Sequence, residues 1–235
     1  MTSTLDSSTN SYKINHSSSD SNYYTEAMPT DEYNSINTNK GYYIGRFEAG
    51  DSTLPTAGTS SLRGEGASQT NAIAIKKGYA PYNYITRTNA KNLAEAMDSA
   101  QSYSATTKLC SSYAWDTAIN FIQNKVSGYG SSSPQGNYKD VTSFTYKDIT
   151  GATQTKANGD STLIPTGQTT AVCNIYDLGG NVWEWTTESC SDSSLPYAIR
   201  GGDSVVDYGV YPAGLRGCIS DGTYGGLGFR VTLFL

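Results

Sequence analysis

NIYDLGGNVWEW, residues 174–185, is the stretch of this sequence that carries most of the structural information. Its glycine pair at 179–180 allows a tight turn, because glycine accepts backbone conformations that other residues avoid. The bulky run VWEW, residues 182–185, then predicts an extended segment in the core. The sequence therefore predicts a turn that leads into a buried strand.

Two further blocks follow near the C-terminus, RGG at 200–202 and GFR at 228–230. With the first block, in this order and spacing, they resemble the family of the formylglycine-generating enzyme, whose domain is a variant of the C-type lectin fold. The resemblance implies an α+β domain with two helices, short antiparallel strands and extensive loops. It also implies that Arg230 is a buried structural arginine paired with a carboxylate. The family includes oxidases and non-catalytic binding domains, among them the variable proteins of diversity-generating retroelements.

The N-terminal segment, residues 1–39, differs in composition from the rest. It is dominated by Ser, Thr, Asn, Asp and Tyr and has few aliphatic residues, so it cannot collapse by itself. Two interpretations stay open: a flexible tail, or an arm whose tyrosines dock on the domain or on a neighbouring subunit. GYYIGRFEAG, residues 41–50, predicts a strand and resembles the first strand of the family. We therefore expect a polar arm or linker over 1–39 and the lectin-like domain over 40–235.

Two amphipathic segments predict helices. One follows a cap at Thr88 and runs through residues 89–100, and the other follows a cap at Ser112 and ends before Gly128. In both, apolar residues recur at three- and four-residue spacing, so these faces belong to the core. Residues 126–170 are mostly small and polar, and we expect loops and one hairpin there.

Charge and hydropathy exclude several partners. The net charge is -5, and no run of Lys or Arg is longer than Lys76–Lys77, so we expect no nucleic acid. No apolar stretch reaches the length of a membrane span, and the first twelve residues lack the features of a secretion signal. We therefore expect synthesis in a cytoplasm and no membrane insertion.

The cysteines are widely spaced, and the sequence has a single histidine, His16, so we expect no zinc site. A disulfide stays open, although cysteines in a domain of this size more often sit unpaired near the core. The four cysteines are Cys110, Cys173, Cys190 and Cys218.

The resemblance implies a calcium site in the first block. Carried over position by position, its ligands would be the side chains of Asp177 and Glu184 and the carbonyl groups of Gly180 and Val182. Ligands that are all oxygen suit this hard cation. The alternative is that Asp177 caps the turn and Glu184 accepts backbone hydrogen bonds, without a metal.

The oxidases of the family carry two copper-binding cysteines at the fourth and ninth positions after the Gly-Gly pair. Those positions hold Val206 and Tyr211 here, and neither side chain replaces a thiolate. Cys218 lies seven residues further on, without a partner at the right spacing. Because His16 lies in the N-terminal segment, no Ser-His-Asp or Cys-His set can be drawn either. We expect no catalytic residues, no copper and no enzymatic activity.

The stretch between the last two blocks, residues 203–227, is expected to form a ligand-binding face. It is rich in Tyr, Ser, Gly and Asp, the mixture that adaptable binding surfaces favour. It contains no Lys, Glu, Gln, Met or Trp. In proteins diversified by a retroelement, adenines in asparagine-type codons are replaced while the third base stays a pyrimidine, and such codons cannot encode these five residues. The composition therefore agrees with such a system. The alternative is an ordinary irregular segment whose tyrosines pack. The expected ligand-binding residues are Asp203, Ser204, Asp207, Tyr208, Tyr211, Ser220, Asp221, Thr223 and Tyr224, and the Asp and Tyr residues among them are expected to face solvent.

The leading hypothesis is a non-catalytic protein that binds a receptor through a variable C-terminal face. It would sit on a phage tail or a bacterial cell surface, be diversified by a retroelement, and bind a protein or glycan receptor on a host or neighbouring cell. Residues 1–39 could join it to further copies or to virion subunits. Two alternatives are a structural component of a virion or surface assembly and an oxidase of the formylglycine-generating type with displaced cysteines.

Overall fold

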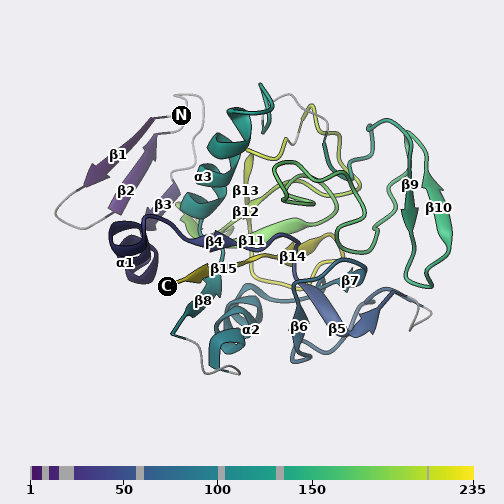
Figure 1. Cartoon of the computed structure of the whole chain (residues 1–235), viewed down its shortest axis with the longest axis horizontal. Helices are drawn as coiled ribbons and strands as arrows, with labels where there is room; N and C mark the ends of the chain where they lie inside the picture. Colours follow the sequence, from purple (N-terminus) through teal and green to yellow (C-terminus); the bar gives the residue numbers. More distant parts are fainter. Residues whose placement is uncertain are drawn as a thin grey trace.

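In the computed structural model, the N-terminal strands, the end of the organising block (residues 174–185) and the GFR block lie in one sheet (Figure 1). Side chains are described from residue 28 onward. The residues that the structure describes are 2–6, 11–15, 24–56, 61–99, 104–130, 135–210 and 212–235.

The central strand of this sheet is β11 (Trp183–Cys190), which follows the predicted turn. It pairs antiparallel with β12 (Tyr197–Arg200), and β13 (Arg216–Ile219) continues the sheet beyond β12. The other edge of β11 pairs with β14 (Leu227–Phe229) in parallel and with β3 (Tyr24–Ala27) antiparallel. The sheet ends in β2 (Ser11–Asn15) and β1 (Thr2–Asp6). The organising block and the GFR block are therefore neighbours in the sheet.

Three small sheets surround the central one. The first has β15 (Val231–Phe234) between β4 (Tyr43–Ile44) and β8 (Thr106–Leu109). The second has β5 (Gly50–Pro55) between β6 (Ile73–Ala74) and β7 (Tyr79–Pro81). The third is the hairpin of β9 (Phe144–Lys147) and β10 (Thr153–Lys156), which confirms the hairpin predicted within residues 126–170. It projects at the end of the molecule opposite β1 and β2 (Figure 1).

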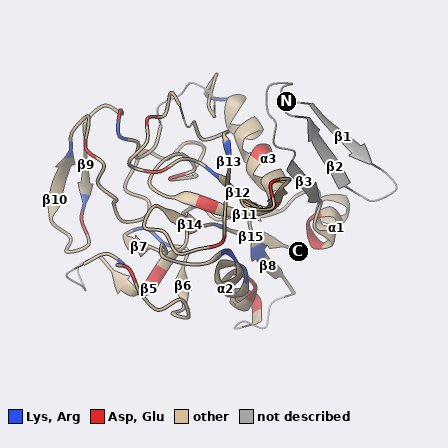
Figure 2. Ribbon diagram, turned by 180° about the vertical axis from the view of Figure 1, so that it is seen from behind, with Lys and Arg blue, Asp and Glu red and all other residues tan. Residues whose placement is uncertain are grey.

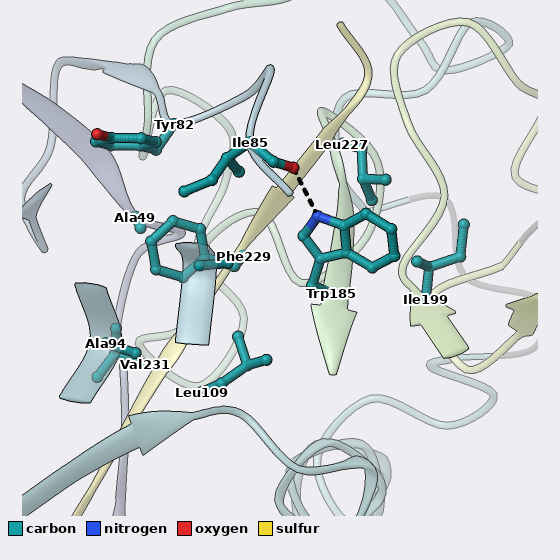
Figure 3. Close-up of a cluster of buried hydrophobic side chains, with 11 residues drawn as sticks. Ala49, Tyr82, Ile85, Ala94, Leu109, Trp185, Ile199, Leu227, Phe229 and Val231 are labelled. Atoms are coloured by element: carbon teal, nitrogen blue, oxygen red, sulfur yellow. Dashed lines mark hydrogen bonds between the residues drawn. The ribbon is translucent and has the colours of Figure 1, made fainter. Parts of the chain in front are cut away.

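One apolar cluster packs around Trp185 of β11 and helix α2 (Arg87–Ser99) (Figure 3). The Trp185 side chain is fully buried, and its indole Nε1–H donates a hydrogen bond to the carbonyl oxygen of Ile85 at 3.0 Å. Phe229 of β14 and Ala94 of α2 lie in the same cluster. The tryptophan therefore fills the core and satisfies its polar atom there.

A second apolar cluster packs around Trp115 of helix α3 (Ser112–Gln123). Its indole Nε1–H donates to the carbonyl oxygen of Ala213 at 2.9 Å. Asp116 of the same helix pairs with Arg200 of β12, so α3 covers the opposite face of the sheet from Trp185. The predicted stripe of α3 is buried, whereas in α2 Ala90 and Ala94 are buried and Leu93 and Met97 are partly buried against the first cluster.

The helix caps differ slightly from the predicted ones. In α2 the hydroxyl of Thr86, instead of Thr88, accepts a hydrogen bond from the amide of Asn89 at 3.3 Å. In α3 the hydroxyl of Ser111, instead of Ser112, accepts from the amide of Ala114 at 3.0 Å. At the start of each helix two hydroxyl residues lie within two positions of each other, and the sequence pattern alone does not show which of them is the cap.

The strand expected over residues 41–50 is interrupted. Only the short β4 and the start of β5 at Gly50 are strand. Between them the Glu48 side chain is fully buried and Arg46 is exposed, so these residues do not share one face.

Part of the expected N-terminal arm packs against the domain. Residues Thr30–Asn39 form helix α1, a third helix where two were expected. The hydroxyl of Ser111 donates to Glu32 Oε2 at 2.6 Å, and the amide of Leu235 donates to the Ser35 hydroxyl at 3.3 Å. Residues 30–39 thus pack against the domain through Glu32 and Ser35, whereas Tyr33 is exposed, so the tyrosine docking of the second interpretation is not seen in this helix.

A disulfide joins Cys190 at the end of β11 to Cys218 in β13, across the intervening β12. The sequence favoured unpaired cysteines, because spacing alone does not show which residues meet in a sheet. The bridge closes a loop of 28 residues in sequence, and it holds the strand that follows the RGG block to the central strand.

None of the helices in the described part of the chain has the length and apolar character that spanning a bilayer requires.

Replacing Trp185 by alanine should lower the free energy of unfolding by about 3–5 kcal/mol, because it empties the centre of a fully buried cluster. Urea denaturation followed by circular dichroism measures the change. Val205→Ala, at an exposed residue, is the control and should stay within about 0.5 kcal/mol. Equal losses for the two variants would contradict this assignment of the core.

Candidate functional site

The loop between β12 and β13, residues 201–215, carries the first group of exposed side chains. Gly201 and Gly202 begin it with φ angles of 97° and 74°, and a Cβ atom on Gly201 would lie 3.3 Å from the Trp115 ring. The chain can therefore leave the sheet close to α3 only with glycine here. Beyond them Val205 and Val210 are 54% and 62% exposed.

Neither valine was among the ligand-binding residues expected from the sequence. The signal that could have found them is an apolar residue, without strand or helix period, inside a Gly- and Asp-rich loop. Of the expected residues in this loop, Asp207 is exposed and Tyr208 is half-buried, with its ring 6.2 Å from that of Tyr138. Tyr211 lies outside the described residues.

The loop contacts Gly130, Lys139 and Asp140. The amide of Lys139 donates to the carbonyl oxygen of Val206 at 3.0 Å, and the amide of Tyr208 donates to Asp140 Oδ1 at 2.9 Å. Further along, the amide of Gly214 donates to the carbonyl oxygen of Gly130 at 2.9 Å. These contacts use mainly backbone atoms of the loop, so they do not depend on its side chains.

Asp203 and Ser204 do not face solvent, which corrects the expectation for Asp203. They are 8% and 4% exposed. Asp203 Oδ1 accepts a hydrogen bond from the amide of Val205 at 3.0 Å, and burial raises the pKa of its carboxyl group. The Ser204 hydroxyl donates to the carbonyl oxygen of Ser161 at 3.1 Å. Both side chains hold the base of the loop.

The second group of exposed side chains lies in residues 220–224, between β13 and β14. Thr223 and Tyr224 are exposed, and the hydroxyl groups of Ser220 and Tyr224 are 3.2 Å apart. Asp221 is exposed as well, but its Oδ1 accepts from the amide of Arg87 at 3.0 Å, at the first residue of α2. A carboxylate in this position stabilises the helix N-terminus, so Asp221 has a structural role.

The two loops meet where they leave the core. A Cβ atom on Gly226 would collide with the Asp203 carboxylate, so only glycine permits this contact. The end of the second loop is fixed by a hydrogen bond from the amide of Tyr84 to the carbonyl oxygen of Tyr224 at 3.0 Å. Residues 205–210 and 223–224 are thus the exposed parts of two loops with a shared base.

The carboxylates of the organising block have partners within the protein. Asp177 Oδ2 accepts from the amide of Gly167, and its Oδ1 accepts from the Thr169 hydroxyl, both at 2.5 Å. Arg230 is fully buried and donates through Nη2 to Glu184 Oε1 at 2.7 Å and through Nε to Oε2 at 3.1 Å. The sequence prediction that Arg230 pairs with a buried carboxylate is confirmed.

This arrangement does not fit the calcium ion that the resemblance implied. Its four donors would be Asp177, Glu184 and the carbonyl groups of Gly180 and Val182, but Arg230 occupies both oxygens of Glu184. No group of three or more His, Cys, Asp or Glu residues within the described ranges could hold a metal ion. The guanidinium supplies the positive charge that a cation would have supplied.

A third carboxylate, Glu48, lies in the same buried cluster. Its Oε1 accepts from the Asn181 side chain, and its Oε2 has no hydrogen-bond partner among the described residues. Burial, and then the charges of Asp177 and Glu184, raise the pKa of Glu48 well above its ordinary value. Burial and these neighbouring charges therefore favour the protonated form of Glu48 in the folded protein.

A second buried network lies on the α3 side of the sheet and was missed from the sequence. Asp116 of α3 pairs with Arg200 at 2.5 Å and also with Arg216, and Arg216 pairs with Glu188 of β11 at 2.9 Å. Acidic residues of β11 thus lie at the centre of the molecule (Figure 2). Glu184 and Glu188 are four residues apart, a spacing that places them on one face of a strand.

The sequence between residues 93 and 233 matches the model of the sulfatase-modifying factor enzyme 1-like domain. The chain belongs to this family.

Two solved structures are similar to this chain. Variable protein 1 of Treponema denticola shares 16% identity and covers 83% of this chain and 84% of its own, with a TM-score of 0.49. A structure titled CarF shares 16% identity and covers 65% of this chain and 67% of its own, with a TM-score of 0.45. Comparison with curated proteins finds no match. Likeness at this level says nothing of ligand or activity.

Glu184→Gln should lower the free energy of unfolding by about 3–5 kcal/mol, because it leaves the buried Arg230 charge unbalanced. Chelator should not change the melting temperature of the parent protein, since the counter-charge is a guanidinium. The control Glu95→Gln breaks the surface pair with Lys108 and should cost about 0–1 kcal/mol. A melting temperature that falls with chelator and recovers with calcium would restore the metal site.

Glu48→Gln should change how stability depends on pH. A carboxyl group whose pKa is raised by folding stabilises the native state fully below its unfolded pKa of about 4.3, and this contribution declines as pH rises toward the folded pKa. Glutamine mimics the protonated form and does not titrate. The stability of the variant relative to the parent should therefore increase as the pH of urea denaturation is raised from acid through neutral. A difference that stays constant with pH would show that Glu48 does not titrate on unfolding.

Proposed function

We propose that this chain is a non-catalytic ligand-binding protein whose contact surface is formed by residues 205–210 and 223–224. The observation that carries the proposal is the contrast in burial along the C-terminal segment. Gly201 to Ser204 and Ala213 are buried, whereas the residues between 205 and 210 are exposed or half-buried. An exposed surface with aromatic and apolar contacts on a rigid base is what protein recognition requires.

The thiol chemistry supports a binding role over the oxidase alternative. Val206 stands at one of the two cysteine positions implied by the family resemblance, and Cys218 is closed in the disulfide with Cys190. A cysteine sulfur in a disulfide is not available as a thiolate, so it serves neither as a copper ligand nor as a nucleophile. Stoichiometric copper(I) uptake by the parent protein would favour the oxidase.

The absence of five residue types from 203–227 supports diversification by a retroelement. Presentation on a phage tail or a bacterial surface is supported by the disulfide between Cys190 and Cys218, because such bridges persist in oxidising surroundings. The partner would be a protein or glycan receptor on a host or neighbouring cell.

The contact surface can be tested without its natural receptor. A display library that randomises Val205, Asp207, Val210, Thr223 and Tyr224 should remain folded in most members, because surface substitutions usually cost less than about 0.5 kcal/mol. Selection against lysozyme as a model target should then yield specific binders, which are measured by titration of purified variants.

The matched control is a library on exposed residues of the β9–β10 hairpin, Thr145, Lys147, Thr153 and Thr155, selected in the same way. Binders from the loop library alone support the proposal. Loss of folding in the loop library, or equal recovery from both libraries, would refute it.

A further inference from the structure

A cavity of about 250 Å³ lies between residues 135–144 and residues 169–170. Its wall includes Val141, which directly follows the two residues that hydrogen-bond the loop 201–215, Lys139 and Asp140. The cavity and residues 205–210 are therefore connected by a short, fixed piece of chain.

The residues that line the cavity are uncharged, and most of them carry a hydroxyl or amide group. Thr142, Ser143 and Thr170 are exposed, and their hydroxyl groups have no side-chain hydrogen-bond partner in the described part of the protein. Gln135 also lines it, and its Oε1 is buried without a partner among the described residues. Such hydroxyl and amide groups both donate and accept, so they suit a ligand that is rich in hydroxyl groups.

One aromatic ring stands among these polar groups. Phe144, at the start of β9, lines the cavity and is half-buried. An aromatic face next to hydroxyl and amide groups matches a sugar ring, which has an apolar C–H face and a polar edge. A charged ligand would find no opposite charge in this lining and would have to give up hydration without compensation.

We propose that this cavity binds one ring of a neutral saccharide, with Phe144 under the ring and Gln135, Thr142, Ser143 and Thr170 at its hydroxyl groups. This inference rests on the proposed function, because it names the chemical class of the ligand. Pockets for drug-sized ligands measure roughly 300–1,000 Å³, so this smaller cavity admits a single ring. The rest of the ligand extends toward residues 205–210.

The test is a titration of the whole, isotope-labelled parent protein with the methyl glycosides of glucose, galactose, mannose and N-acetylglucosamine, followed by NMR. At least one sugar should shift the backbone signals of Phe144 and Thr170 in a saturable manner. Thr170→Val removes one hydroxyl at constant shape and should weaken binding about three- to tenfold, the effect of one neutral hydrogen bond. Phe144→Leu keeps an apolar side chain, removes the flat aromatic face and should abolish binding.

The control is Thr155→Val, an exposed threonine of β10 that does not line the cavity, and it should bind like the parent. The saccharide site is refuted if no neutral sugar shifts these signals, if Thr170→Val binds as the parent does, or if sialic acid binds more tightly than every neutral sugar. Because these titrations use the parent loop, their failure is distinct from failure of the loop library.

Discussion

The fold depends on the hydrogen bonds and the ion pair that the Arg230 guanidinium makes. Besides both oxygens of Glu184, it donates to the carbonyl oxygens of Gly45 at 2.8 Å, Tyr176 at 3.0 Å and Asp177 at 3.1 Å. One buried planar group thus joins the chain after β4, the turn before β11, the strand β11 itself and the junction of β14 and β15. The charge can stay buried because its hydrogen bonds are satisfied and Glu184 balances it.

The turn before β11 is likewise held by contacts between residues that do not face solvent. Gly180, with a φ of 71°, lies so close to residue 137 that a Cβ atom would be 2.6 Å from the Asn137 carbonyl. Asn137 in turn donates to Asn181 Oδ1 at 2.9 Å, and Asn181 donates to Glu48. The turn is therefore fixed by backbone proximity and amide hydrogen bonds. It is also bonded to the base of the first loop, because the amide of Gly180 donates to the carbonyl oxygen of Gly201 at 2.9 Å and the amide of Ser204 donates to that of Asn181 at 3.1 Å.

The sequence predicted the parts of the fold that rest on local pattern. The turn before Trp183, the two amphipathic helices, the hairpin and the buried Arg230 all follow from glycine pairs, apolar periodicity or a family motif. It did not predict the contacts that only the sheet order creates. Asp116, Glu188 and Arg216 read as surface charges when taken singly, because a charge is usually exposed unless it is paired, and its partner here lies up to 100 residues away.

The same limit applies to the candidate site, and it explains why the loop can vary. Arg200 ends β12, Arg216 begins β13, and these two residues face each other in the sheet. Both arginines bind the carboxylate of Asp116 on α3, so the two ends of the loop 201–215 are held by one partly buried acceptor. The ends of the loop are held together by residues outside its exposed part. The contacts of these residues therefore offset the entropy that is lost when the loop is closed. Substitution of exposed residues between these arginines therefore changes the contact surface and leaves its attachment to the fold intact.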